Sequence, residues 1–212
     1  MALFKNKYRI ESSRLKGWDY SDPGIYFVTI ATKNRACYFG NVENGDMHLN
    51  ELGEIAKQCF EKIPEHFPFV SLDVFVIMPN HVHGIIIIND PVKTKNGSRI
   101  VDRVPWIVET QDLASLQRLP PSPPFPSLSQ LPSSSDNRFG PQSKNLASII
   151  RGYKIGVTKY ARKNNIPFQW QSRYYDHIIG DEKSLNHIRQ YIIQNPLNWQ
   201  TDAENPVINA NV

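Results

Sequence analysis

Runs of apolar residues predict four β-strands along this chain. Residues 24–32 are rich in β-branched and aromatic side chains, and residues 72–78 and 82–88 are similar in character. Short runs of this kind are typical of buried strands. Only Pro79-Asn80 and the first histidine separate the second run from the third, which predicts a tight connection between them. A fourth run of aromatic and β-branched residues covers 168–179.

Apolar residues at intervals of three and four predict three helices between and after those strands. The first begins at residue 51, where Asn50 can cap it, and it follows a hairpin turn predicted at Asn44-Gly45. The second covers 144–163 and the third covers 182–194. The resulting order is the split β-α-β-β-α-β plan of ferredoxin-like and RRM-like proteins, with one extra C-terminal helix. We therefore predict an α+β fold with an antiparallel sheet.

Residues 91–143 interrupt this pattern. Within them, residues 120–135 hold six prolines and six serines and show little helical or strand periodicity. A structureless run of this length is unusual inside a compact domain. We therefore expect a flexible insertion, which divides a single domain made of residues 1–90 and 144–206.

Positive charge is distributed unevenly along the 212 residues, which carry 24 lysines and arginines against 20 acidic residues. Residues 144–175 hold seven basic residues and no acidic one. Local positive fields of this kind suit a polyanion such as nucleic acid, although two solvated helix faces would give the same pattern. The candidate phosphate contacts are Arg14, Lys16, Arg151, Lys154 and Arg173.

The two cysteines, Cys37 and Cys59, show neither metal-binding nor redox spacing, which fits a reducing compartment. No apolar stretch approaches the roughly 20 residues needed to cross a bilayer. The first residues also lack the basic and then apolar order of a signal peptide. We therefore expect a cytoplasmic protein that does not bind membranes.

The segment from Met78 to Gly84 carries the first candidate chemistry. Successive side chains of a strand point to opposite faces, so His81 and His83 share one face while Val82 faces the other. Their Cα atoms would lie about 6.5 Å apart, which allows both imidazoles to bind one metal ion. Such a histidine pair alone is weak evidence for a metal site, because short motifs arise readily by chance.

The predicted final helix carries residues that could complete such a site. Tyr191 and Asn195 are four residues apart and therefore lie one above the other on one helix face. If that helix packs across the sheet near the histidines, the Asn195 amide oxygen can join the two imidazoles. The Tyr191 oxygen can then attack a phosphate bound at an open coordination position. Tyr174 and Tyr175 are competing nucleophiles, but neither has a ligand-type residue one helical turn away.

These motifs resemble those of a known family of enzymes. The block Met-Pro-Asn-His-Val-His-Gly resembles the HUH signature, and Tyr191-Ile-Ile-Gln-Asn-Pro196 resembles the nucleophile block of single-tyrosine transposases. Together with the upstream Trp170 to Ile179 segment, they are similar to the REP-associated tyrosine transposases, which act on repeated palindromic DNA. The resemblance covers roughly residues 8–90 and 144–206.

The resemblance implies metal-dependent cleavage and rejoining of single-stranded or hairpin DNA through a 5′-phosphotyrosine intermediate. It implies Tyr191 as the nucleophile and His81, His83 and Asn195 as ligands of Mg²⁺ or Mn²⁺. Mobile relatives usually carry glutamine at the Asn195 position, so this chain departs from the pattern there. The protein is expected to act as a monomer or a homodimer.

Two other functions remain compatible with the sequence. One is a non-catalytic nucleic-acid-binding module, because the same fold plan hosts RNA-recognition domains and a fold does not determine a function. The other is a hydrolase that uses a metal-bound water on small phosphoesters, without a covalent intermediate. A complete eight-fold barrel of the zinc-hydrolase type is disfavoured, since such barrels typically need about 250 residues.

Overall fold

The computed structural model describes residues 18–89, 91–93, 99–101, 144–202 and 204–206. Its centre is a four-stranded antiparallel sheet, with the strands in the order β4-β5-β1-β8. The four strands are β1 (Gly24–Ala31), β4 (Val70–Ile77), β5 (His81–Ile88) and β8 (Tyr175–Ile179). The predicted α+β fold with an antiparallel sheet is confirmed.

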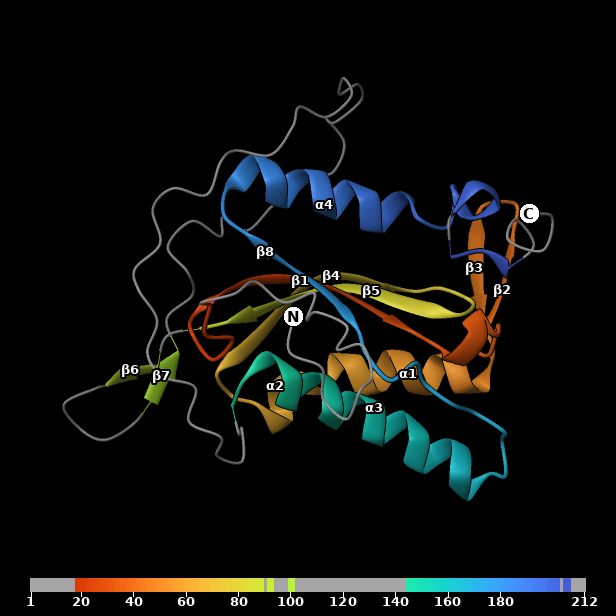
Figure 1. Ribbon diagram of the computed structural model, residues 1–212, viewed down its shortest axis with the longest axis horizontal. Coiled ribbons are helices and arrows are strands. Elements are labelled where there is room, and N and C mark those ends of the chain that lie inside the picture. The colour runs from red at the N-terminus through yellow and green to blue at the C-terminus, as the bar shows by residue number, and fades with distance from the viewer. Residues whose placement is uncertain (1–17, 90, 94–98, 102–143, 203, 207–212) are drawn as a thin grey trace, which may run out of the picture.

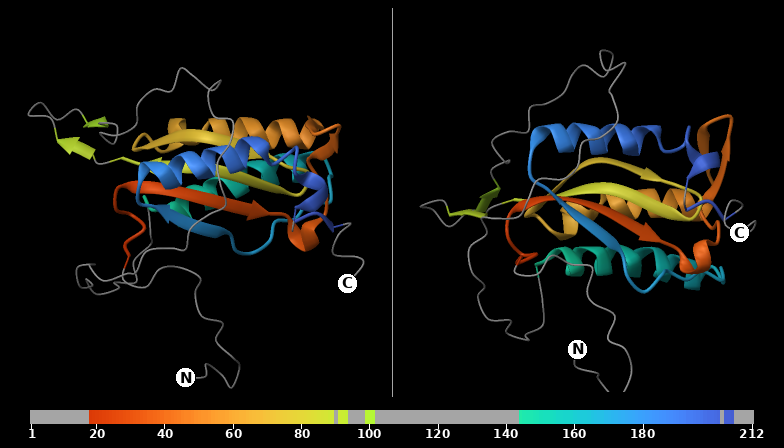
Figure 2. Two further views of the ribbon diagram at one scale, coloured as in Figure 1. Left: turned by 90° about the horizontal axis from the view of Figure 1, so that it is seen from above. Right: turned by 45° about the horizontal axis from the view of Figure 1, so that its top comes forward.

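Helices cover both faces of this sheet. Figure 1 shows α1 (Glu51–Glu61), α2 (Ile63–His66) and α3 (Leu146–Lys163) below the sheet, whereas α4 (Glu182–Gln194) lies above it. The views in Figure 2 show the same separation, with α4 crossing the sheet on its own. None of the helices among the described residues is long and apolar enough to cross a membrane.

Capping side chains determine where the long helices begin. The Asn50 side chain accepts a hydrogen bond from the Gly53 backbone at 2.9 Å, as predicted for the start of α1. Asn145 and Ser148 form a reciprocal capping box, so α3 begins at residue 146 and not at residue 144. Asp181 caps α4 by accepting from the Ser184 backbone at 2.8 Å.

Two tight hairpins join neighbouring strands where the sequence predicts them. The pair β2 (Gly40–Glu43) and β3 (Asp46–Leu49) turns at Asn44 and Gly45, whose φ values of 54° and 85° are those such a turn requires. The strands β4 and β5 are joined through Pro79-Asn80, where the Met78 backbone donates to the His81 carbonyl at 2.8 Å. This second turn places the first histidine at the start of β5.

The fourth predicted strand is wrong in its first half. β8 covers only the last five of the twelve predicted residues, and Trp170 contributes an isolated bridge to Thr32. The Lys154 ammonium donates instead to the carbonyls of Gln171 and Arg173, at 2.7 and 3.1 Å. These side-chain hydrogen bonds satisfy backbone groups that a strand would have paired.

Parts of the predicted insertion and of the N-terminal segment lie outside the described residues. Within the insertion, the described residues form one short antiparallel pair, β6 (Pro91–Lys93) and β7 (Arg99–Val101). Residues 102–143 are outside the described part of the chain, and so are Arg14 and Lys16.

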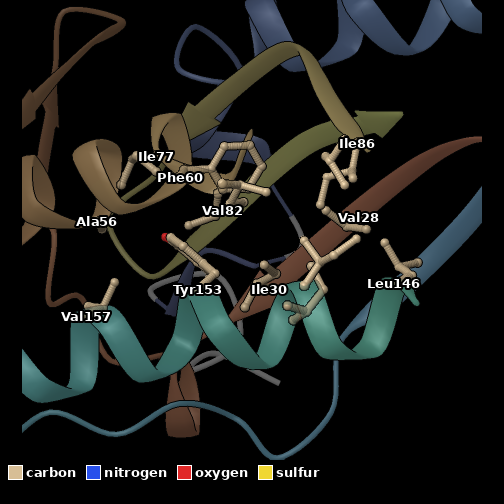
Figure 3. Close-up of a cluster of buried hydrophobic side chains, with 14 of the residues drawn as sticks. Val28, Ile30, Ala56, Phe60, Ile77, Val82, Ile86, Leu146, Tyr153 and Val157 are labelled. Atoms are coloured by element: carbon tan, nitrogen blue, oxygen red, sulfur yellow. The ribbon is translucent and has the colours of Figure 1, made fainter. Parts of the chain in front are cut away.

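Successive side chains of each strand point to opposite faces of the sheet, and the apolar ones form a layer on each face. The larger lies between the sheet and the helices α1 and α3, and Figure 3 shows Phe60, Tyr153, Val82 and Ile86 within it. The smaller lies under α4 and consists of Ile25, Phe27, Ile85, Ile87, Ile179, Leu185 and Ile192. The side chains of α4 therefore approach the sheet face that carries the odd-numbered residues of β1 and β5.

Candidate metal centre

The two histidines of β5 lie side by side on the sheet face covered by α4. His81 and His83 pair in register with Ala31 and Thr29 of β1, and Val82 between them is buried in the opposite core. Both histidines are buried, and their ring centroids are 4.4 Å apart. The predicted sharing of one face is therefore observed.

Hydrogen bonds orient the His81 ring. Its Nδ1 lies 2.8 Å from Asn80 Oδ1. The Asn80 amide nitrogen donates to the carbonyls of Arg35 and Glu204 at 2.9 and 2.7 Å, so its oxygen must face the ring. His81 therefore donates from Nδ1 and presents an unprotonated Nε2. That Nε2 atom is buried and has no hydrogen-bond partner among the described residues.

His83 is oriented by its neighbours in the same manner. Its Nδ1 lies 2.9 Å from Thr29 Oγ1, and its Nε2 lies 3.3 Å from the Tyr191 hydroxyl. If the phenol donates to Nε2, the single proton of the neutral ring is on Nδ1 and is donated to Thr29. Both imidazoles are thus contacted at Nδ1, an arrangement common among metal-binding histidines, while Nε2 of His83 faces the Tyr191 hydroxyl.

Burial keeps both rings neutral. It lowers the pKa of His81 to about 4, although the nearby Asp202 carboxylate partly offsets this effect. Burial also holds the pKa of His83 well below its usual value, and the proximity of His81 acts in the same direction. Neutral imidazole is the form that binds metal ions, so the pair is ready for coordination at neutral pH.

Tyr191 reaches this pair from the final helix of the same chain. Its ring centroid lies 5.2 Å from that of His83, and its ring is nearly perpendicular to that of Phe27, with the centroids 6.1 Å apart. The residue as a whole is still 44% exposed. Burial of the remainder raises the pKa of the phenol, with the Asp202 carboxylate adding to the effect.

Asn195 directly follows α4, four residues after Tyr191. The residue is buried, and its side-chain oxygen has no hydrogen-bond partner among the described residues. Its amide nitrogen donates to Asp202 Oδ2 at 3.1 Å. Three acceptor atoms that a cation could bind, on His81, His83 and Asn195, therefore belong to one buried cluster. We take this as a fit between the donors and a divalent cation.

Asp202 is the functional candidate that the sequence did not indicate. One carboxylate oxygen of Asp202 and one ring nitrogen of each of His81 and His83 lie within 4.8 Å of one another. Asp202 directly follows a 3₁₀ turn, Trp199–Thr201, beyond the end of α4. No motif or helical spacing connects it to the histidines, because its place depends on how this turn folds back.

Of the five predicted phosphate contacts, the three in the described part of the chain are not gathered at the histidine pair. Arg151 and Lys154 belong to α3 on the other side of the sheet, where they line a groove with Lys159, Arg162 and Tyr174. Lys154 is partly buried, and its bonds to two carbonyls show a structural role. Arg173 is exposed just before β8.

The competing nucleophile Tyr175 lies farther from the pair than Tyr191. It is 53% exposed and pairs with Thr29, so the strand β1 separates it from His83. Its ring meets that of Phe27 with the centroids 6.3 Å apart. Tyr191, in contrast, lies within hydrogen-bonding distance of the imidazole.

Comparison with known proteins places the sequence among a small set of relatives. No family model matches it. The chain is 42% identical over 192 residues to an uncharacterised protein of Haemophilus influenzae, covering 90% of each. It is 22% identical over 180 residues to a putative REP-associated tyrosine transposase of the same organism, covering 84% of this chain and 73% of that protein.

Two solved structures show weaker likeness. One is a REP-associated tyrosine transposase bound to a REP hairpin, with 16% identity, a TM-score of 0.46, and coverage of 91% of this chain and 73% of that one. The other is a putative transposase from Deinococcus radiodurans, with 14% identity, a TM-score of 0.38, and coverage of 86% and 98%.

Proposed function

We propose that this chain, a REP-associated tyrosine transposase-like protein in the same family as the uncharacterised Haemophilus influenzae protein, cleaves and rejoins single-stranded DNA through Tyr191. The observation that carries the proposal is the position of the Tyr191 hydroxyl, 3.3 Å from His83 Nε2. A nucleophile of this kind needs an accessible oxygen beside groups that stabilise the charge of the reacting phosphate.

The reaction consists of one exchange of bonds at phosphorus. The Tyr191 oxygen loses its proton and forms a bond to the phosphorus of a DNA phosphodiester. The bond from that phosphorus to the 3′ oxygen breaks, and the 3′ oxygen takes up a proton. The products are a 5′-phosphotyrosine and a free 3′ hydroxyl, and attack by another 3′ hydroxyl reverses the exchange and joins strands.

His81, His83 and Asn195 are the residues that we assign to hold Mg²⁺ or Mn²⁺. The bound cation supplies Lewis-acid polarisation of the phosphate and favours ionisation of the nearby phenol. Support comes from the buried, unpaired acceptors of His81 and Asn195, since burying such atoms without a partner is costly. Thr29 and Asn80 keep the two rings in the required orientation.

We further propose that each chain acts with its own tyrosine. α4 packs on the sheet of its own chain through Leu185 and Ile192, and this packing brings Tyr191 to His83. A monomer then contains every group that the reaction needs. The exposed Arg173, just before β8, and Arg151, on the groove of α3, are the proposed contacts for the phosphates of a hairpin substrate.

The test is to incubate the purified full chain with an oligonucleotide hairpin bearing a single-stranded flank and with Mn²⁺ or Mg²⁺. Denaturing electrophoresis and intact-mass spectrometry should show a covalent protein–DNA adduct. Tyr191→Phe should abolish the adduct and retain binding, whereas the matched change Tyr175→Phe should retain both. If DNA binding is indifferent to a chelator and to His81→Ala, and no adduct forms, the protein is a binding module and the proposed reaction is wrong.

A further inference from the structure

On the basis of the proposed function, we infer that Asp202 is a direct ligand of the bound cation and supplies the negative charge that the other ligands lack. The His81 and His83 imidazoles and the Asn195 amide are neutral donors. A divalent cation placed among them would be buried without a counter-charge, and an isolated buried charge is strongly unfavourable. One carboxylate beside the imidazoles removes half of that charge.

The geometry supports this assignment. A carboxylate oxygen of Asp202 lies within 4.8 Å of a nitrogen of each imidazole. Two atoms that each bind one cation at about 2.1 Å can be at most about 4.2 Å apart, so side-chain shifts of a few tenths of an ångström would be enough to bring these three atoms to a single ion. His81 Nε2 and the Asn195 side-chain oxygen, both buried, have no hydrogen-bond partner among the described residues. Asp202, His81, His83 and Asn195 thus offer two nitrogen and two oxygen donors.

The position of Asp202 is fixed by the turn in which it lies. Its Oδ1 accepts from the Glu204 backbone at 2.7 Å, and its carbonyl accepts from the Asn205 backbone at 2.9 Å. The Glu204 carbonyl in turn accepts from the Asn80 side chain at 2.7 Å, and Asn80 also orients His81. One hydrogen-bonded chain therefore connects the carboxylate to the imidazole that it faces.

The hydrogen bond from Asn195 does not fully occupy the carboxylate. The Asn195 amide donates to Oδ2 at 3.1 Å, and each carboxylate oxygen has two lone pairs. The same bond directs the amide nitrogen of Asn195 to Asp202, which leaves the amide oxygen available to a cation. A merely structural Asp202 would act by holding Asn195 alone, and this alternative predicts different results below.

The first experiment measures Mn²⁺ binding to the full chain by electron paramagnetic resonance, which counts free Mn²⁺ directly and needs no activity. Asp202→Ala should raise the dissociation constant on the order of 100-fold, the upper end of the range for changes near a metal site. Asp202→Asn, which removes the charge and keeps an oxygen, should also weaken binding at least about tenfold. Glu204→Gln is the matched control, because that side chain pairs with Arg35, and it should leave binding unchanged.

An unchanged affinity in Asp202→Asn would overturn the inference, because a side chain that only accepts from Asn195 does not need its charge. Circular dichroism and thermal unfolding without metal establish that each variant folds. If Asp202→Ala does not fold, the comparison of Asp202→Asn with Glu204→Gln still decides the matter.

A second experiment tests direct ligation by spectroscopy. Asp202→Cys is loaded with Co²⁺, and a thiolate bound to Co²⁺ gives an intense charge-transfer band in the near ultraviolet. The band should appear in Asp202→Cys and be absent from the wild-type chain and from Glu204→Cys, although all of them retain Cys37 and Cys59. Absence of the band in folded Asp202→Cys that binds Co²⁺ would refute direct ligation.

These measurements separate the inference from the proposed reaction. If Mn²⁺ binds and Asp202 variants weaken it, Asp202 is a ligand even where no DNA adduct forms, and only the proposed function fails. If the wild-type chain forms the adduct while Asp202→Asn binds Mn²⁺ as tightly as the wild type, the reaction stands and the role of Asp202 is wrong.

Discussion

A partly buried ion pair holds the tyrosine helix against the sheet, and its removal is the sharpest test of how the site is assembled. Arg189 precedes Tyr191 by two residues on α4 and reaches Asp73 of β4. The guanidinium contacts Asp73 Oδ2 through Nε at 3.0 Å and through Nη2 at 2.5 Å. The two side chains are only 14% and 12% exposed. Apart from this pair, α4 buries few apolar residues.

Replacing Arg189 by Met leaves the partly buried Asp73 carboxylate without its cationic partner. Removing one member of a buried pair typically costs about 3–5 kcal/mol, and the small remaining exposure puts the expected loss at roughly 3 kcal/mol. If α4 detaches locally, the same free energy lowers the docked population relative to the detached one by on the order of 100-fold, because about 1.4 kcal/mol corresponds to tenfold. If the packing of α4 on the sheet is only slightly favourable in the wild-type chain, this loss detaches the helix and displaces Tyr191 from His83.

Urea denaturation measures the first effect, and hydrogen exchange of the α4 amides together with the rate of adduct formation measures the second. Arg162→Met, an exposed change on α3, is the matched control and should cost less than about 0.5 kcal/mol. The double variant Asp73→Leu with Arg189→Met should recover part of the stability, because no lone charge remains buried. A loss below about 1 kcal/mol in Arg189→Met, with unchanged exchange in α4, would refute this account.

Two further predictions follow from the histidine pair and its orientation. The pKa of His81 is about 4 in the folded protein against its usual 6.5, so the unfolded chain takes up the proton first as the pH falls. The contribution of His81 to the free energy of unfolding is therefore fully present above about pH 6.5 and is lost as the pH falls toward 4, with a loss of about 2 kcal/mol at pH 5. Urea titrations at several pH values should find this dependence on pH reduced in His81→Gln but not in the exposed His48→Gln. Asn80→Ala removes the acceptor for His81 Nδ1 and should weaken Mn²⁺ binding about 10–100-fold, whereas the same change at the exposed Asn41 should leave the binding isotherm as it is.

Local rules predicted the parts of this molecule that depend on neighbouring residues. The period of two in a strand placed His81 and His83 on one face, and the helical period placed Asn195 above Tyr191. Asn50 capped its helix, and Asn44-Gly45 formed its hairpin turn, because both act within a few residues. These relations survive folding because they are set by backbone geometry.

Tertiary contacts decided what the sequence did not predict. The run from 168 to 174 has the composition of a strand, yet the partly buried Trp170 packs against the core through Phe39, Tyr153 and Phe168. The Lys154 ammonium then takes the carbonyls that would have extended β8. Asp202 reaches the histidines only because a turn anchored to Asn80 folds the chain back toward them. No periodic pattern in the sequence predicts that the chain folds back there.

The docking of α4 on its own sheet has a consequence for how the proposed activity should depend on the amount of protein. Since one molecule carries both the phenol and the imidazoles, the number of complete centres rises in direct proportion to concentration. If each centre were shared between two molecules, the number of complete centres would instead rise with the square of the protein concentration at high dilution. Few copies per cell would then be enough to supply working centres, without any need for the molecules to find each other.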